Sequence, residues 1–166
     1  MRTIAGPIAV LCVAIVAGCS SISVNQDYDP DFDFSAWRTF TFAPYESKMG
    51  MDQITYGEFK QAISKNLTAK GMVASDQNPD FVVSMATAQK EQTEITQAGI
   101  GWWGTDVYQY EEGTLLVDFY ETKSQKLEWR GTAKGELADN PSQQEKQAHI
   151  NSVVAEMLEQ FPPKSK

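Results

Sequence analysis

The sequence predicts a two-layer α+β domain, with a mostly antiparallel sheet and two amphipathic helices packed on one face. Three observations lead to this prediction. Segments with the two-residue period of strands occur together with segments that have the 3.6-residue period of helices. The two helical segments are apolar on one side only, so each can cover one face of a sheet. The 166 residues are enough for one domain and contain no internal repeat.

Most of the expected strands are rich in aromatic and β-branched side chains. They span residues 37–42, 81–87, 114–120 and 127–134, and the second has room to extend toward residue 95. The last two form a hairpin around a polar turn. Residues 22–25 alternate between apolar and polar, so a first strand can begin there, and residues 97–113 are expected as a connection rich in glycine and aromatics.

The first amphipathic helix is expected over residues 52–71. Its apolar face carries Phe59, Ile63 and Leu67. Asp52 or Thr55 can cap its start, and Gly71 suits the left-handed position after its end.

The second helix is expected near the C-terminus, with its apolar residues following the i, i+3, i+4, i+7 rule through Phe161. Asn140 is expected as its N-cap and Pro141 as its first residue, where proline loses no hydrogen bond. Pro162 and Pro163 end it.

The first 18 residues have the features of a signal peptide. Arg2 supplies a positive charge, residues 4–16 are mostly apolar, and two small residues follow. The apolar run is too short to cross about 30 Å of hydrocarbon comfortably as a helix. The run ends in Val16-Ala17-Gly18-Cys19, which resembles the bacterial lipobox. This resemblance implies that Cys19 is acylated and becomes the first mature residue.

The lipobox also implies a location. Bacterial lipoproteins typically carry three acyl chains, such as palmitate, whereas one chain alone binds a bilayer only marginally. Under the sorting rule of these lipoproteins, Ser20 permits transfer to the outer membrane, facing the periplasm. An uncleaved signal anchor and an ordinary secretory signal are the alternatives. The expected organisation is residues 1–18 as signal peptide, 19–26 as lipidated N-terminus and short tether, and 27–162 as a single α+β domain.

Composition excludes several functional classes. With 14 Lys and Arg against 22 Asp and Glu, the net charge of −8 argues against nucleic-acid binding. One histidine and two cysteines leave little for a metal site or a cofactor, and we expect neither. After cleavage at Cys19 the chain cannot form an internal disulfide. His149, beside the apolar stripe of the last helix, is expected as a solvated or half-packed histidine rather than a catalytic base.

Four alternating aspartates open the domain, namely Asp27, Asp29, Asp31 and Asp33. A calcium loop would need glycine at its sixth position and glutamate at its twelfth, where Phe32 and Arg38 stand. We therefore expect exposed carboxylates rather than a metal site.

The most distinctive connection contains Gly99-Ile100-Gly101-Trp102-Trp103-Gly104. Its glycines have the spacing of a dinucleotide-binding turn, but a strand-like pattern follows where a helix would be required. Trp102 and Trp103 are candidate contacts with an envelope partner or a membrane interface. The alternative is a hairpin tip whose rings fold back on the domain.

Two stretches resemble the bacterial lipoprotein family called domain of unknown function 4136. The first contains Asp27-Tyr28-Asp29 and Trp37-Arg38-Thr39-Phe40, and the second is a hairpin that closes with Trp129-Arg130-Gly131. Glu121 stands where many members have aspartate. The resemblance implies an envelope lipoprotein with an α+β fold and brings no established catalytic residues. From the strand pattern itself, Trp129 is expected in the core and Arg130 opposite a carboxylate across the sheet.

These observations favour a non-catalytic outer-membrane lipoprotein that acts as an envelope scaffold or binding module. A second hypothesis is an envelope hydrolase or transferase that uses carboxylates such as Glu111, Glu112 and Asp118. A third is a carrier that holds a small ligand between sheet and helices. An empty apolar pocket would support the carrier, and a densely packed core would exclude it.

Overall fold

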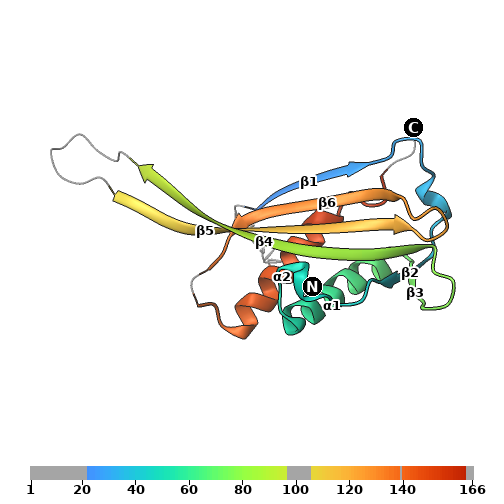
Figure 1. Cartoon of the computed structure of the whole chain (residues 1–166), viewed down its shortest axis with the longest axis horizontal. Coiled ribbons are helices and arrows are strands. Elements are labelled where there is room, and N and C mark those ends of the chain that lie inside the picture. Colours follow the sequence, from blue (N-terminus) through green and yellow to red (C-terminus); the bar gives the residue numbers. More distant parts are fainter. Residues whose placement is uncertain (1–21, 97–105, 139, 164–166) are drawn as a thin grey trace, which may run out of the picture.

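The computed structural model describes residues 22–96, 106–138 and 140–163; for residues 89–111 it describes the backbone of the strands but not the side chains. It shows a six-stranded sheet with both helices on one face (Figure 1). The strand order is β1-β6-β5-β4-β2-β3. The strands are β1 (Ser23–Tyr28), β2 (Thr39–Phe42), β3 (Val73–Ala74), β4 (Phe81–Thr96), β5 (Asp106–Glu121) and β6 (Leu127–Glu136). The helices are α1 (Gln53–Ala69) and α2 (Gln143–Leu158), with short 3-10 turns η1 (Phe34–Ala36) and η2 (Ser47–Met49).

The predicted fold class is confirmed. The pairs β1–β6, β6–β5 and β5–β4 are antiparallel. Only the pairs that β2 forms with β4 and with β3 are parallel. Antiparallel neighbours need only short turns, whereas α1 makes the crossover between the parallel strands β2 and β3.

The sheet takes in more of the chain than the sequence pattern indicated. β5 begins at Asp106, inside the expected connection, because it pairs with β4 from Phe81↔Glu121 to Thr96↔Asp106. β1 begins at Ser23, so part of the expected tether is a strand that pairs with β6. Pairing satisfies backbone groups that an isolated loop would leave to water, and it depends on a partner far away in sequence.

The β4–β5 hairpin extends beyond the rest of the sheet as an arm. The ladder between β5 and β6 ends at Glu112↔Glu136. Residues 91–96 and 106–111 therefore pair only with each other, and they project from one end of the domain (Figure 1). We call these residues the arm.

Helix α1 begins where the sequence predicts. Asp52 is its N-cap, and its Oδ1 accepts hydrogen bonds from the amides of Ile54 (2.8 Å) and Thr55 (2.9 Å). The hydrogen bonds from Thr55 lower the pKa of Asp52 to about 2, so the cap is ionised at neutral pH. Gly71 follows the helix with φ +87°, the left-handed conformation that glycine adopts without strain.

Helix α2 begins two residues later than predicted. Ser142, not Asn140, is the N-cap, so the prediction of Asn140 was wrong. The reason is a capping box, in which the Ser142 amide donates to Glu145 Oε2 at 2.8 Å and Ser142 Oγ accepts from the Glu145 amide at 3.3 Å. Asn140 instead adopts φ +48°, which is unsuited to an N-cap.

Aromatic rings fill the end of the core opposite the arm. Trp129 is fully buried, as predicted, with its ring centre 4.6 Å from that of Phe119. Phe161, just beyond α2, lies 5.2 Å from Trp129 and 4.9 Å from Phe119. A Cβ on Gly131 would come within 2.5 Å of the Trp129 ring, so this core requires glycine there. The glycine that closes the Trp129-Arg130-Gly131 sequence is therefore explained by packing against the Trp129 ring.

Both helices point the same way along the sheet. At their N-terminal ends Lys146 Nζ donates to Thr55 Oγ1 at 2.8 Å, and at the opposite end Lys70 Nζ donates to the Glu159 carbonyl at 3.4 Å. β1 starts at the N-terminal end of the helices, because Ser23 pairs with Lys134 near the base of the arm. The start of the domain, both helix N-termini and the arm therefore share one end (Figure 1).

Replacing Asp80 with asparagine is expected to remove a pH-dependent part of the stability. Asp80 Oδ2 accepts three hydrogen bonds, from the amides of Arg38 and Thr39 at 2.8 Å and from Thr39 Oγ1 at 2.9 Å. Partial burial raises the pKa of Asp80, but these bonds together outweigh burial and lower it. We expect Asp80→Asn to lower the free energy of unfolding by about 1 kcal/mol at pH 7. This is less than the full value of a hydrogen bond to a charged group, because Asp80 is partly exposed to water.

The sign of the pH dependence follows from the lowered pKa. The stabilisation by Asp80 is complete above its unfolded-state pKa of about 3.9 and is lost as the pH falls through the lower pKa of the folded state. Urea midpoints of both proteins from pH 7 to pH 2 should therefore converge at acid pH. A difference that stayed constant to pH 2 would contradict the role of the ionised carboxylate. Asp31→Asn, at an exposed aspartate, controls for loss of one charge.

Candidate functional site

A groove of about 990 Å³ lies between the sheet and the N-terminal ends of both helices. Its inner wall is apolar and is made by Phe59, Leu115, Ala133, Ile150 and Val153. The segment after β6, with Leu137 and Pro141, and the residue before β1, Ile22, complete the wall. The size is that of a small-molecule site, for which volumes of about 300–1,000 Å³ are usual.

The groove exists because the sheet carries small side chains at this end. On the face that the helices cover, the lining residues from its strands include Gly113, Ala133 and Gly135. At the other end the same sheet carries Phe81, Phe119 and Trp129, which are fully buried. The helices bridge both ends, so the space that aromatic rings fill at one end stays open at the other. An open apolar pocket between sheet and helices is the feature expected of a ligand carrier.

A polar network connects the two helices beside the groove. Glu58 is 9 % exposed, and its Oε2 lies 3.0 Å from Lys146 Nζ. The Gln143 side chain donates to Glu58 Oε1, and Thr55 Oγ1 donates to Asp52 Oδ2 at 2.7 Å. The charge of Lys146 is thus balanced by Glu58, and the network holds the N-terminal ends of α1 and α2 together.

The helix N-termini at the groove are occupied by the protein's own side chains. Asp52 accepts from the first amides of α1, and Ser142 with Glu145 caps α2. The positive end of each helix dipole therefore already faces a side-chain oxygen. Neither helix N-terminus is therefore available to bind an anionic ligand.

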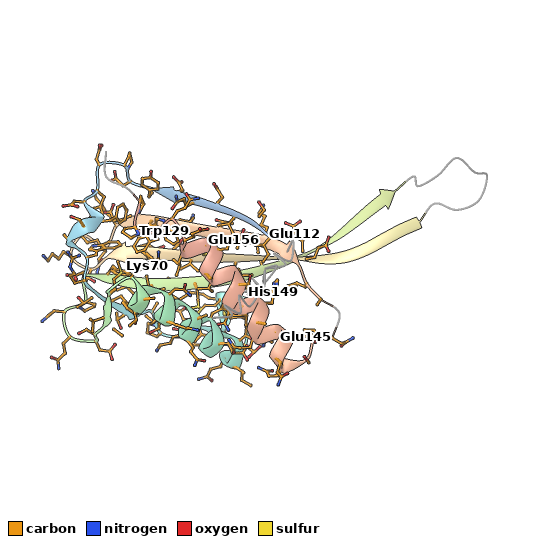
Figure 2. The ribbon with its side chains drawn as sticks, turned by 180° about the vertical axis from the view of Figure 1, so that it is seen from behind. Lys70, Glu112, Trp129, Glu145, His149 and Glu156 are labelled. Carbon is orange, nitrogen blue, oxygen red and sulfur yellow. The ribbon has the colours of Figure 1, made fainter. Side chains whose placement is uncertain are left out.

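His149 is exposed on α2 and lines the mouth of the groove. Figure 2 shows it one turn further along α2 than Glu145. This exposure matches the expectation of a solvated helix histidine. Neither Glu58 nor the groove itself was singled out by the sequence, although a glutamate next to Phe59 of the apolar stripe was an available signal.

On the opposite, helix-free face of the sheet, Arg130 pairs with Asp118 as predicted. The two residues are directly opposite each other in the β5–β6 register. Arg130 donates from Nε to Oδ1 and from a terminal nitrogen to Oδ2, both at 2.7 Å. Tyr120 Oη donates to Oδ2 at 3.3 Å, and burial and then the Asp118 charge raise the pKa of Tyr120. Asp118 therefore serves as a structural acceptor.

The carboxylates of the hydrolase hypothesis do not converge. Glu112 and Asp118 lie on the same face of β5 but six residues apart, which is roughly 20 Å along a strand. The side chain of Glu111 lies outside the described part of the chain. This geometry gives no support to a catalytic pair of Glu112 and Asp118, which would have to lie within about 10 Å.

Disrupting the Arg130–Asp118 pair is expected to reveal a small coupling. In a double-mutant cycle with Arg130→Ala and Asp118→Ala, we expect a coupling energy of about 1 kcal/mol, because the geometry is bidentate but the arginine side chain is 41 % exposed. Urea denaturation at 0.1 M and 1 M salt should show the coupling weaken as salt screens it. The highly exposed Lys48–Glu46 pair is the control and should show no measurable coupling. A value of zero at Arg130–Asp118 would contradict the argument.

The aspartates near the start of the domain are exposed, as expected. Asp29 and Asp33 use one oxygen each to accept a backbone amide, from Asp31 and Ser35 respectively, both at 2.9 Å. Within the described part of the chain, no group of three or more His, Cys, Asp or Glu side chains gathers as a metal site.

Several predicted site residues lie outside the described residues. They are Cys19, Ser20, Trp102, Trp103 and the glycines between 99 and 104. Their roles remain predictions. Over the residues that the structure does describe, no helix is both long enough and apolar enough to span a bilayer.

Solved structures share this fold at low sequence identity. A PDZ domain protein from Parabacteroides distasonis has 14 % identity and a TM-score of 0.62, covering 87 % of this chain but only 37 % of its own. The PelC dodecamer from Paraburkholderia phytofirmans has 14 % identity and a TM-score of 0.50, covering 82 % of this chain and 94 % of its own. A comparison with curated proteins finds no match.

The family comparison covers nearly the whole described domain. The model of the family called domain of unknown function (DUF4136) matches residues 24–163, from within β1 to just beyond Phe161. The match includes both stretches that resemble this family and all the residues that line the groove except Ile22. The chain therefore belongs to the DUF4136 family.

Proposed function

We propose that this chain is a lipoprotein of the bacterial cell envelope, attached through acyl chains on Cys19 to the periplasmic face of the outer membrane. The lipobox ending in Cys19 and the following Ser20 support the anchor and its location. DUF4136 membership supports it as well, since the resemblance to that family implies an envelope lipoprotein. In this proposal the domain itself is a non-catalytic binding module.

The lipobox at Cys19 is the observation that carries this proposal, and the short distance from Cys19 to the sheet sets where the domain would lie. Three residues separate Cys19 from Ser23, the first residue of β1. Four residue steps span at most about 14 Å. A lipid on Cys19 would therefore hold the groove end of the domain close to the bilayer surface.

Two surfaces of the domain support a binding role. The groove between the sheet and the helices has an apolar inner wall made by Phe59, Leu115, Ala133, Ile150 and Val153. The arm carries, on the segment that joins its two strands, the candidate partner contact Trp102 and Trp103. We propose that these tryptophans contact an envelope protein, because adjacent tryptophans are typical of the anchoring residues of interfaces.

The anchor is tested by the mass of the mature N-terminus. In the full-length protein expressed in a bacterium, we expect the first mature residue to be acylated Cys19 and the protein to fractionate with outer membranes. Cys19→Ala should abolish acylation, whereas Cys12→Ala, in the same signal peptide, should leave it unchanged. An unmodified Cys19, or a mature chain that retains its first 18 residues, would refute the proposal.

The partner contact is tested by affinity capture from cross-linked envelopes. The variant with Trp102→Ala and Trp103→Ala should lose one or more partners of the unmodified protein. A variant with Ile54→Ala and Val73→Ala removes apolar side chains that are 74 % and 61 % exposed elsewhere, and it should keep the partners. Identical partner sets for all three proteins would exclude the tryptophans as the contact.

A carrier of small apolar ligands is the second candidate function, and the groove is the observation that favours it. Organic extraction of the purified protein, followed by mass spectrometry, should release a stoichiometric apolar molecule if this function holds. Absence of such a molecule from protein purified without detergent would count against it.

A further inference from the structure

We propose that the groove holds one acyl chain of the lipid on Cys19, so that the domain contains a binding site for its own membrane anchor. This inference rests on the proposed acylation of Cys19. It assigns an occupant to the groove and goes beyond the attachment itself.

The chemistry of the groove suits a hydrocarbon chain. Its inner wall is formed by Phe59, Leu115, Ile150 and Val153, which present only carbon atoms. At its mouth Lys146 lies 3.0 Å from Glu58, the caps occupy both helix N-termini, and Lys134 is an exposed lysine at the edge. The inner wall itself offers no charged side chain, so it suits the hydrocarbon part of a ligand, whereas Lys134 and Lys146 lie where a polar headgroup would leave the groove.

The position of the N-terminus identifies which hydrocarbon chain is nearest. Ile22, the first described residue, is itself part of the groove wall. Cys19 is three residues earlier, so its Cα lies within about 11 Å of the Cα of Ile22. An acyl chain tethered at this distance has an effective concentration in the millimolar range at the groove. A free ligand would need to be dissolved at a similar concentration to compete with it. The tethered chain therefore has the advantage over any dissolved apolar molecule.

Occupancy of the groove is compatible with stable anchoring. One acyl chain binds a bilayer only marginally, whereas two membrane signals give a stable anchor. If one of three chains lies in the groove, the other two can remain in the bilayer. The domain would then be held by a covalent tether and by the bound chain, which restricts its orientation on the membrane.

Aromatic rings fill the end of the core opposite the groove. At this end the rings of Phe119 and Trp129 are stacked with centres 4.6 Å apart, and Phe161 covers them. The second hollow, beside Tyr28 and Pro162, has a volume of only about 70 Å³. Of these two hollows, only the groove is large enough to take an acyl chain.

Photocross-linking through the acyl chains tests the inference. The full-length protein is expressed in bacteria fed a fatty acid that carries a diazirine, so that both phospholipids and the Cys19 lipid become photoreactive. Membranes are irradiated, the protein is digested, and cross-linked peptides are identified by mass spectrometry. We expect a link between the acylated Cys19 peptide and peptides that contain Ala133, Ile150 or Val153.

Filling the groove should remove this link. Ala133 lies on the groove wall and is 3 % exposed, so Ala133→Phe places a ring in the space that the chain would occupy. Ala138→Trp, at an exposed residue of the groove, narrows the space without altering buried packing. Ala155→Phe, on the exposed side of α2, is the matched control and should keep the link. Circular dichroism confirms that each variant is folded.

The outcomes separate the inference from the proposed function. A Cys19 link to groove peptides that either filling variant loses and Ala155→Phe keeps supports the inference. Acylated Cys19 that cross-links only to other lipids overturns it, and so do groove peptides linked only to free phospholipid. In both of these cases the anchor at Cys19 stands. An unacylated Cys19 peptide would instead overturn the proposed function, and the inference with it.

Discussion

Replacing Trp129 with alanine is expected to lower the free energy of unfolding by about 3–5 kcal/mol, the usual cost of deleting a large buried aromatic side chain. Trp129 is fully buried and stacks on Phe119, with Phe161 packed edge-on at 5.2 Å. Its Nε1 donates to Gln26 Oε1 at 3.1 Å and so connects β6 to β1. The substitution removes the packing and also leaves Gln26 without this donor.

Chemical denaturation followed by circular dichroism measures this effect, since fluorescence would change with loss of the tryptophan itself. Because a domain of this size is stable by only about 5–15 kcal/mol, the variant could be partly unfolded at 37 °C. Ile54→Ala is the control, because Ile54 is 74 % exposed and its truncation should cost at most about 0.5 kcal/mol. A loss below about 1 kcal/mol for Trp129→Ala would show that the aromatic core does not pack as described.

Replacing Gly50 with alanine is the second large effect, and we expect it to cost at least about 2 kcal/mol through backbone strain and overpacking. Gly50 has φ +74°, and a Cβ there would meet the Thr87 carbonyl oxygen at 2.0 Å. Thr87 Oγ1 also donates to the Gly50 carbonyl at 2.8 Å. The backbone of Gly50 is thus held directly against β4 at the rim of the groove, and a methyl group would push the two apart.

Gly57→Ala is the matched control for this substitution. Gly57 lies inside α1, and a Cβ there would have nothing within 4 Å. Alanine favours the helix over glycine by about 0.8–1.0 kcal/mol, so this variant should be more stable than the original protein. Thermal and urea unfolding of both variants should therefore shift in opposite directions. Equal shifts would contradict the close approach of Gly50 to β4.

Much of the fold followed from patterns that act locally. The apolar stripe of α1 was predicted from spacing within a single segment and is confirmed, and of the two predicted caps, Asp52 and Thr55, the structure selects Asp52. Arg130 was predicted opposite a carboxylate because strands of a hairpin pair in register, and Asp118 is that carboxylate. The prediction of Asn140 as the N-cap of α2 was wrong because two local signals competed, and the chain forms the Ser142–Glu145 capping box instead.

The candidate site was harder to predict, because its walls come from distant parts of the chain. Ile22, Phe59, Ala133 and Val153 meet only once β1 has paired with β6 and both helices have packed on the sheet. Each of these residues looks like an ordinary core residue in its own segment. The Glu58–Lys146 contact likewise joins α1 to α2, and in the sequence the strands β3 to β6 lie between these two helices.

The sequence by itself determined the order of the longer strands and of the two helices, the choice of Asp52 or Thr55 as the cap of α1, and the prediction of a lipid on Cys19, because each depends on the chemistry of a few neighbouring residues. Only the tertiary structure decided that β4 and β5 continue into an arm and that a groove lies beside Ile22, just before β1. The physical reason is that strand length depends on finding a partner, and an empty volume is what packing leaves between elements. Neither quantity belongs to any single segment of the sequence.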